Sequence, residues 1–301
     1  MQSTRHPKYA AALALLLALL PLFARAGQKV FVAPEASHLK QGEELLHLYV
    51  LDLLGGDSML LRHGEDDLLV DTGDEKHFPQ LEAMLSELSA DDLTVFNTHP
   101  HRDHVGGLFD LTEKVKVRAF YTAFPEDAED PAIIQRRAVR HLAELGLHMQ
   151  RLLPGELLPF AEGVEISMMQ NLKGANANEQ SAMLMIRYRE ASLLLTADIG
   201  HKRQGVFERE QGDALDVDIL KAPHHGLENL SAGFLKSTSP ELAFITNGSV
   251  NSKRTRKTLD NNRIPYLLAT RGVIHLSTDG KTWYVEQVPR ALGKADEVNH
   301  K

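Results

Sequence analysis

The sequence of 301 residues contains no cysteine. This absence excludes thiol catalysis, disulfide bonds and cysteine-based zinc knuckles, so any metal ion must be bound by histidine and carboxylate side chains. Positive charge is also scarce, because 41 acidic residues outnumber 33 Lys and Arg and give a net charge of −8. This balance argues against a general nucleic-acid binder, whose basic surface neutralises phosphates. It is compatible with a local, metal-centred site for an anionic substrate.

Long apolar runs are lacking beyond the N-terminal stretch, so we expect the mature chain to be soluble, with no integral membrane association. The N-terminus carries Arg5 and Lys8, then an apolar stretch from Ala10 to Phe23, and a small-x-small site that ends at Ala26. The stretch is shorter than the ~20 residues that a spanning helix needs, which disfavours an uncleaved anchor. We therefore predict a signal peptide over 1–26, cleaved after Ala26, and a periplasmic or secreted protein.

The remaining composition, with 43% hydrophobic and 25% charged residues, is typical of a globular protein. We predict one domain over 27–288 and a flexible tail over 289–301. Two groups of strands interleaved with helices, including a hairpin around Arg189, predict two packed sheets with helices outside, an α/β (α+β) architecture. The expected helices lie within 77–90, 132–147 and 201–211, and the expected strands at 45–54, 58–62, 68–70, 93–96, 115–121, 182–188, 192–196, 217–221, 242–246, 265–269, 272–277 and 282–286.

Ligand-type side chains cluster after the strand expected at 93–96, in the stretch "FNTHPHRDHVGG". His99 and His101 are two residues apart, so in extended backbone both point to one side and can share a metal ion. Asp103 and His104 follow where the chain turns, and can face a second metal ion. Imidazole and carboxylate groups suit Zn²⁺, and they also accept Mn²⁺ or Fe. The alternative is a polar loop of chance composition, which four such residues within six positions disfavour.

The array resembles the H-x-H-x-D-H signature of the metallo-β-lactamase fold, and three further segments match that family in the same order. "LLVDTGD" is similar to the motif in which Asp71 would orient the metal loop. "LLLTADIG" is similar to the motif whose aspartate, Asp198, would bridge two metal ions, and "DILKAPHHG" to the one that supplies the last histidine. Taken singly, "DTG" also suits a capped turn, and Asp198 could merely cap the next helix. Together the motifs imply a four-layer αββα sandwich.

Within that family the sequence is most similar to the metallo-hydrolase domain of the ComEC competence proteins, through "GGDSMLLR", "PGELLPFAEGVEISMM" and "NEQSAMLMIRYREASLLLTADI". This resemblance runs from about Leu45 to Tyr284 and implies a stand-alone, exported form without the membrane channel region. Such relatives lack the histidine that other members place before the bridging aspartate. Asn178 and Ser181 occupy that region, and we expect them to line the site, although they also suit a turn. Ser231 stands in for the serine that those relatives place directly after "HHG".

The resemblance implies two divalent metal ions as cofactors, zinc above all, which lower the pKa of a bridging water towards neutrality. Asp103 and His224 would be the catalytic residues, with His224 donating a proton to the leaving group. Whether His224 or His225 is the metal ligand stays open. The implied ligands are His99, His101 and Asp198 for one ion and Asp103, His104, Asp198 and His225 for the other.

Basic residues follow the strand expected at 242–246, and we single out Lys253 and Arg254 as able to steer a phosphate or a nucleic-acid backbone. A solvated helix face is the alternative, and no aromatic residues interleave to form a stacking platform. The leading hypothesis is a hydrolase that cleaves a phosphodiester, DNA or nucleotide-like, through the metal-bridging hydroxide. The alternatives are a carboxylic ester, lactone or β-lactam hydrolase, and a non-catalytic DNA- or envelope-binding protein. The oligomeric state stays open.

Overall fold

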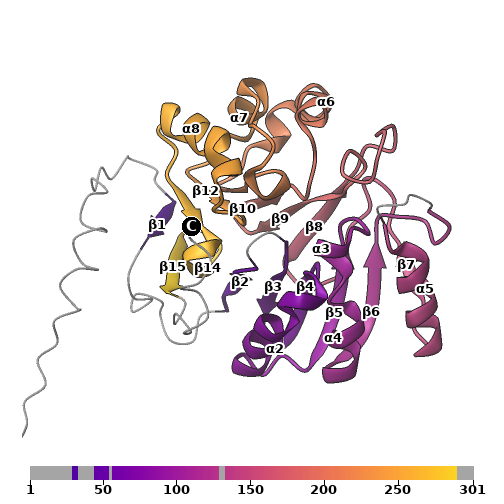
Figure 1. Cartoon of the computed structure of the whole chain (residues 1–301). Coiled ribbons are helices and arrows are strands. Elements are labelled where there is room, and N and C mark those ends of the chain that lie inside the picture. Colours follow the sequence, from indigo (N-terminus) through magenta and orange to yellow (C-terminus); the bar gives the residue numbers. More distant parts are fainter. Residues whose placement is uncertain (1–28, 33–43, 54–55, 129–132, 290–301) are drawn as a thin grey trace, which may run out of the picture.

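The computed structural model of the protein places two mixed β-sheets face to face (Figure 1). The described residues are 29–32, 44–53, 56–128 and 133–289. The predicted signal peptide lies outside these ranges, and so do residues 290–301 of the predicted tail. Within these ranges, none of the helices has the length and apolar character needed to cross a membrane.

Within the described residues, the larger sheet has nine strands. Its centre is built from antiparallel neighbours β2, β3 and β4, and β5 and β6 then continue the sheet in parallel. The carboxyl ends of β4 and β5 therefore lie side by side. In spatial order the strands are β1 (Val30–Val32), β15 (Trp283–Pro289), β14 (Gly272–Thr278), β2 (Leu46–Val50), β3 (Met59–His63), β4 (Asp66–Val70), β5 (Asp92–Asn97), β6 (Lys116–Thr122) and β7 (Met149–Arg151).

The smaller sheet has six strands. Strands β10, β11, β12 and β13 run parallel, so their carboxyl ends also share one edge. Strands β8 and β9 add to it as antiparallel neighbours. In spatial order the strands are β13 (Tyr266–Leu268), β12 (Leu242–Ile245), β11 (Ile219–Lys221), β10 (Ala191–Leu195), β9 (Met183–Tyr188) and β8 (Val164–Met169).

The main hydrophobic core lies between the two sheets. Alternate residues of β2, such as Leu46 and Leu48, are buried while their neighbours are partly exposed, as the two-residue period of a strand requires. Leu48 shares one buried cluster with Ile186 of β9 and Phe244 of β12. Removal of this apolar surface from water holds the sheets together and gives the site a rigid frame.

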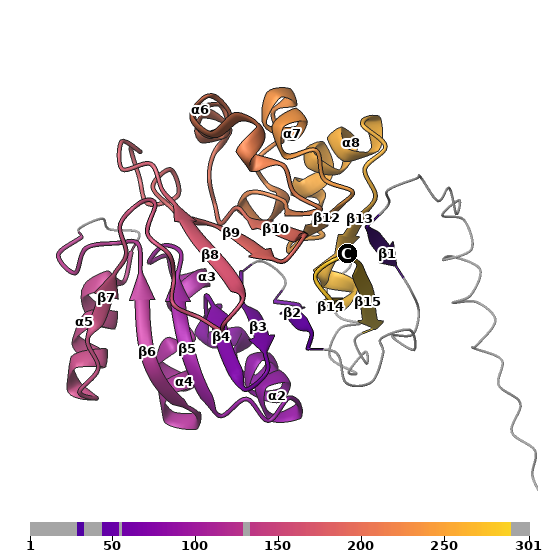
Figure 2. The same ribbon diagram turned by 180° about the vertical axis from the view of Figure 1, so that it is seen from behind.

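Helices cover the outer face of each sheet, as the four-layer prediction requires (Figure 2). On the larger sheet, α2 (Phe78–Glu87), α4 (Leu108–Lys114) and α5 (Gln135–Glu144) bury one apolar cluster. On the smaller sheet, α6 (His201–Gln211), α7 (Ala232–Thr238) and α8 (Lys253–Asn261) bury another. The remaining short elements are α3 (Arg102–Val105), η1 (Glu75–His77), η2 (Gly212–Leu215), η3 (His224–Gly226), η4 (Val250–Ser252) and η5 (Ala269–Arg271).

The predicted fold class is confirmed, and most predicted elements are found within a few residues of their expected bounds. The hairpin around Arg189 joins β9 to β10, and the helix expected at 201–211 is α6. Two predicted ranges were wrong in extent. β2 ends at Val50, because the chain then leaves the sheet and packs Leu53 in the outer cluster beside the turn at Gly73.

The helix expected at 132–147 is shorter, since α5 covers only Gln135–Glu144. Its start is delayed because Ile134 N–H donates to the Pro100 carbonyl at 3.0 Å, and Ile133 bridges to His101. It ends ahead of Gly146, whose φ of +73° is left-handed. The segment before α5 is therefore tied to the histidine-rich loop.

Candidate metal centre

Asp71, at the turn after β4, anchors the histidine-rich loop. Its backbone is left-handed, with φ at +58°, a conformation that Asp tolerates better than most residues. One carboxylate oxygen accepts hydrogen bonds from Thr98 N–H at 2.8 Å and the Asn97 amide at 2.9 Å. The other accepts from the Thr98 hydroxyl at 2.7 Å and lies 2.7 Å from Nδ1 of His104. Asp71 thus fixes both the start of the loop and the ring of His104.

The loop itself begins at the end of β5 and folds into the short helix α3. Nε2 of His99 lies 3.1 Å from Nδ1 of His101, so the two rings meet. The loop packs on the turn after β4, because Gly107 N–H donates to the Gly73 carbonyl at 3.0 Å. A β-carbon at Gly107 would collide with the carbonyl oxygen of Thr72, so only glycine allows this approach.

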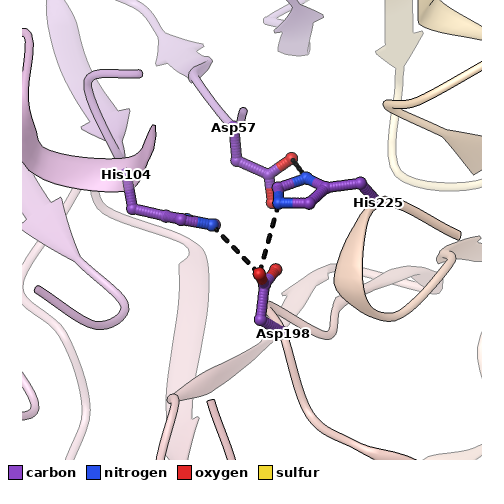
Figure 3. Close-up of side chains that lie close together, drawn as sticks. All are labelled: Asp57, His104, Asp198 and His225. Atoms are coloured by element: carbon purple, nitrogen blue, oxygen red, sulfur yellow. Dashed lines mark hydrogen bonds and ion pairs between the residues drawn. The ribbon is translucent and has the colours of Figure 1, made fainter. Parts of the chain in front are cut away.

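Asp198 lies just after β10, and imidazoles from both sheets surround its carboxylate. Its Oδ2 atom lies 3.2 Å from Nε2 of His225, 3.3 Å from Nε2 of His104 and 3.5 Å from Nε2 of His224. Nε2 of His99 lies at 3.9 Å from the same oxygen. Figure 3 shows two of these rings pointing at the carboxylate. Asp198 is not the cap of the next helix, because Gly200 occupies the N-cap position of α6.

His224 and His225 lie in the short helix η3 after β11, both with left-handed φ values of +49° and +54°. Their environments differ. His225 is buried, and its Nδ1 atom lies 3.0 Å from Oδ1 of Asp57 and 3.1 Å from the hydroxyl of Thr246. The side chain of His224 is 26% exposed, and its Nε2 atom lies 3.4 Å from the amide nitrogen of Asn178.

The electrostatics of the cluster favour protons or cations at its centre. Burial acts to lower the pKa of His104, but the carboxylates of Asp198 and Asp71 outweigh it and raise that pKa to about 10. Burial also opposes the charged form of His225, yet Asp198 raises its pKa well above the ordinary value. His99 behaves oppositely, since burial and the charge on His104 lower its pKa. A metal ion can replace the protons that these carboxylates attract.

The donor set fits a divalent metal ion. Ligand-type atoms of Asp57, His104, Asp198 and His225 all lie within 4.8 Å of one another, and all four side chains are buried (Figure 3). Within the described part of the chain, Nε2 of His104, Nε2 of His225 and Oδ1 of Asp198 are buried with no hydrogen-bond partner. Apart from the ion-pair contacts of the two imidazoles with nearby carboxylates, these buried ligand atoms lack partners. Buried polar atoms normally have partners, so the cluster points to a bound cation.

The other predicted site residues lie at different distances from this cluster. Oδ2 of Asp103, which is 40% exposed, lies 3.5 Å from Nε2 of His225. The hydroxyl of Ser181 accepts from Asp198 N–H at 3.2 Å and donates to the Asn178 carbonyl at 2.8 Å. Ser181 therefore supports Asp198, and it also closes the turn that carries Asn178.

Three predicted substrate-binding residues lie around η3 and its neighbours. The hydroxyl of Ser231 caps α7 by accepting from Phe234 N–H at 3.1 Å. Lys253 and Arg254 are exposed in the first turn of α8, and η4 before them packs against η3. Among the contacts of the described residues, none of the hydrogen bonds or ion pairs joins these three to the metal cluster.

Two residues of the site were missed by the sequence reasoning. Asp57 contacts His225, and the fully buried ammonium of Lys221 lies 2.5 Å from Oδ2 of Asp57. Asp57 follows two glycines in "GGDSMLLR", so its local sequence indicates no more than a turn. Lys221 carried a readable signal, because a lysine inside the apolar strand of "DILKAP" must find a buried partner.

Sequence comparison decides the family of the chain. A profile of the Metallo-beta-lactamase superfamily matches residues 51–242, which span β3 to the start of β12 and include every predicted metal ligand. The chain belongs to the metallo-β-lactamase superfamily. As a member it is a metal-dependent hydrolase, and its two sheets with outer helices are the fold of that superfamily. No curated protein sequence matches the chain.

Solved structures of the same fold resemble this metallo-β-lactamase-fold protein at low identity. The metallo-β-lactamase fold protein YhfI from Bacillus subtilis superposes with a TM-score of 0.50 and 14% identity, over 76% of this chain and 99% of that one. A diphosphatase of the PhnP family gives 0.45 and 15%, over 81% and 100%. A B3 metallo-β-lactamase with an active-site glutamic acid gives 0.45 and 15%, over 71% and 86%. The likeness to YhfI shows the fold and leaves the substrate open.

Proposed function

We propose that this protein is an exported hydrolase with a binuclear metal centre that cleaves a phosphodiester, in DNA or in a nucleotide-like molecule. The observation that carries the proposal is the convergence of four imidazole Nε2 atoms on one carboxylate oxygen of Asp198. A buried carboxylate among several imidazoles is the donor arrangement expected of a ligand shared by two metal ions.

The residues divide into two ligand groups that share Asp198. We assign His104, His225 and the more exposed Asp103 to one ion and His99 with His101 to the other, as the family motif implies. Two bound divalent ions would supply a hydroxide near neutral pH and would neutralise charge that develops on the substrate. Asp71 would hold the His104 ring at its Nδ1 atom and so keep Nε2 directed at the metal.

His224 is better placed for proton transfer than for metal binding. Its Nε2 atom lies 3.5 Å from Asp198, but the side chain is a quarter exposed, whereas His225 is buried at 2%. An exposed imidazole can exchange protons with solvent and with a leaving group. The Asn178 amide beside it would donate a hydrogen bond to an anionic substrate oxygen. We therefore assign His225 as the ligand and His224 as the proton donor.

Exposed cationic side chains near the metal centre support a phosphodiester as the substrate class. The protein carries a net charge of −8, yet Lys253 and Arg254 are exposed at the start of α8, next to the η4 segment that packs on η3. Local cationic groups beside a metal centre attract phosphate oxygens and raise the encounter rate with an anionic substrate. Export is supported by the leader pattern of residues 1–26. The likeness to ComEC competence proteins remains part of this proposal.

The test is a hydrolysis panel on the mature protein loaded with Zn²⁺ or Mn²⁺. The substrates are bis-p-nitrophenyl phosphate, single- and double-stranded DNA, a chromogenic cephalosporin and a lactone, and Asp103→Ala is the inactive control. We expect hydrolysis of the phosphodiesters, with a loss of at least ~100-fold in the variant because a metal-ligating carboxylate is removed.

Two results would contradict the proposal at different levels. Turnover of the cephalosporin or the lactone alone would reject the phosphodiester class and keep the hydrolase. Less than one metal ion per chain, unchanged in His101→Ala, would reject the metal-dependent mechanism. N-terminal sequencing of the secreted protein tests export and should begin at Gly27.

A further inference from the structure

Asp57 contacts three segments that build the metal centre, namely the turn after β4, the histidine-rich loop and η3. Its backbone N–H donates to the Asp103 carbonyl at 3.2 Å, and its own carbonyl accepts from Gly73 N–H at 2.9 Å. Its side chain reaches η3 and β11, at His225 and Lys221. A fully buried carboxylate is costly and needs a compensating partner.

The carboxylates of Asp57 and Asp198 contact different nitrogens of the His225 ring (Figure 3). Oδ1 of Asp57 is 3.0 Å from Nδ1 of His225, while Nε2 of the same ring is 3.2 Å from Oδ2 of Asp198. The two ring nitrogens therefore have different functions. Nε2 faces the ligand cluster, and Nδ1 faces the support behind it.

Lys221 completes the support. Its ammonium lies 2.5 Å from Oδ2 of Asp57 and donates to the Ala197 carbonyl at 3.2 Å, and both charged side chains are fully buried. Ala197 directly precedes Asp198 and has a left-handed φ of +46°. One buried ion pair thus contacts the ring of His225 at one end and the turn that carries Asp198 at the other.

The same contacts argue that Asp57 is not itself a metal ligand, although it lies within the cluster. Both of its oxygens are engaged, one by His225 and the other by a cation. A metal ion on Oδ2 would sit beside the ammonium of Lys221 and be repelled. An ionised carboxylate can only accept, so it selects the tautomer of His225 with the proton on Nδ1 and the lone pair on Nε2.

The neighbouring hydroxyl makes this selection necessary. Thr246 Oγ lies 3.1 Å from the same Nδ1 atom and can act as donor or acceptor. If Thr246 alone faced Nδ1, it could donate, which would leave the proton on Nε2 and block that atom as a ligand. Asp57 removes this alternative.

We propose that Asp57 and Lys221 form a positioning pair that fixes the tautomer and orientation of His225 and holds the Asp198 turn, so that both present their ligand atoms to one metal ion. The inference rests on the proposed metal-dependent function, because it requires a metal ion at Nε2 of His225.

The test compares Asp57→Asn with Asp67→Asn in the full mature protein. Asp67 is a matched control, since it is also a buried carboxylate paired with a cation, at 2.7 and 2.6 Å from Arg62, but at the start of β4, away from the cluster.

Zn²⁺ affinity is measured by chelator competition, and the visible absorption of the Co²⁺-loaded protein reports ligand geometry. We expect Asp57→Asn to bind Zn²⁺ about 10–100-fold more weakly, with an altered Co²⁺ spectrum and unchanged stoichiometry. Asp67→Asn should match the parent in both.

The double variant Asp57→Asn/Lys221→Met covers the case in which Asp57→Asn does not fold. It leaves no unpaired buried charge, so it should fold and show the same weakened affinity. Parental affinity and spectrum in Asp57→Asn, or in the double variant, would overturn the inference. Loss of a whole metal equivalent, as in His225→Ala, would make Asp57 a ligand and overturn it too. If the parent protein binds no metal, the proposed function fails first, independently of this pair.

Discussion

The carboxylate of Asp71 accepts three hydrogen bonds and faces the imidazole of His104, so a change of one atom there reaches several parts of the metal centre. Asp71→Asn keeps the shape and tolerates the left-handed backbone, but its one amide oxygen replaces two carboxylate oxygens. Either the donors to Oδ1 (Asn97 and the Thr98 N–H) or the partners of Oδ2 (the Thr98 hydroxyl and His104) therefore lose their acceptor. We expect a loss of about 1–3 kcal/mol in the free energy of unfolding. Zn²⁺ affinity should fall about 10–100-fold. Urea titration and chelator competition measure the two effects.

A control for this change lies three residues further along the chain. Asp74 caps η1, because its carboxylate accepts a hydrogen bond from His77 N–H at 2.8 Å. The Asp74 side chain is 28% exposed. Asp74→Asn preserves that cap and should leave Zn²⁺ affinity at the parental value. Equal losses of affinity in the two variants would contradict the role assigned to Asp71.

His47 and His275 form a second histidine pair, on neighbouring strands of the larger sheet. Nδ1 of His47 lies 3.0 Å from Nε2 of His275, whose ring stacks on Tyr49 at 4.3 Å. Burial is the main cause that lowers the pKa of each histidine from 6.5 to about 4. Arg62 also lowers that of His47, and Glu286 lies 3.7 Å from Nδ1 of His275.

This pair should make the protein sensitive to acid. A histidine with a lowered pKa favours folding above its unfolded pKa near 6.5, and that contribution is lost as the pH falls towards about 4. We therefore expect the urea midpoint to drop between pH 6.5 and pH 4, and to drop less in the variant His47→Asn/His275→Gln. His148→Gln removes an exposed histidine and should retain the full drop. An unchanged acid response in the double variant would reject this source of sensitivity.

Elements with strong local patterns were predictable from the sequence, and elements defined by distant partners were not. The hairpin β9–β10 and helix α6 carry their patterns in adjacent residues, so both were found. Strands β1 and β7 have only three residues each, and their pairing with β15 and β6 depends on the assembled sheet. Short strands of this kind show no alternation to read.

The candidate site shows the same division. His99 to His104 stand together in the sequence, so their ligand character was visible without any fold. Asp57 meets His225 across 168 positions in the chain, and only the packing of two sheets brings them together. The family resemblance supplied Asp71 and Asp198, yet it could not reveal the support at Nδ1 of His225.

Helix α8 allows the proposed substrate class to be tested separately from stability. Lys253 and Arg254 lie in its first turn, where cations oppose the helix dipole. Lys253→Glu/Arg254→Glu should therefore stabilise the protein by about 0.3–1 kcal/mol per site. The same change should lower kcat/KM for an anionic phosphodiester and weaken its dependence on salt. A gain in stability together with a fall in kcat/KM is expected only if these cations attract the substrate.

Lys236→Glu changes the net charge by as much as Lys253→Glu alone, so comparing these two single variants separates local steering from net charge. Lys236 is exposed in the last turn of α7, where a cation suits the dipole, so Lys236→Glu should lose stability. Its kcat/KM should fall less than that of Lys253→Glu. Salt-dependent kinetics on bis-p-nitrophenyl phosphate provide the measurement. An equal fall in kcat/KM in both variants would assign the effect to net charge alone.

The metal centre joins the two halves of the sandwich. His99 and His104 follow β5 of the larger sheet, whereas Asp198 and His225 follow β10 and β11 of the smaller one. Bound metal ions would therefore link the sheets at one edge, while three hydrophobic clusters hold the rest of the fold together. We expect chelation to lower the Tm without unfolding the chain. The stabilisation by metal at 100 times its Kd is about 2.7 kcal/mol.

The size of this effect should depend on pH in a defined direction. In the metal-free protein, Asp198 and Asp71 raise the pKa of His104 to about 10, so this ring holds a proton that favours folding below pH 6.5 and is lost as the pH rises through 10. Metal must displace that proton, so its affinity falls as the pH falls. The difference in Tm between the metal-loaded and chelated protein should accordingly widen from pH 6 to pH 9, and Zn²⁺ binding in weak buffer should release protons. A difference that narrows over this range, or binding without proton release, would place the metal away from His104.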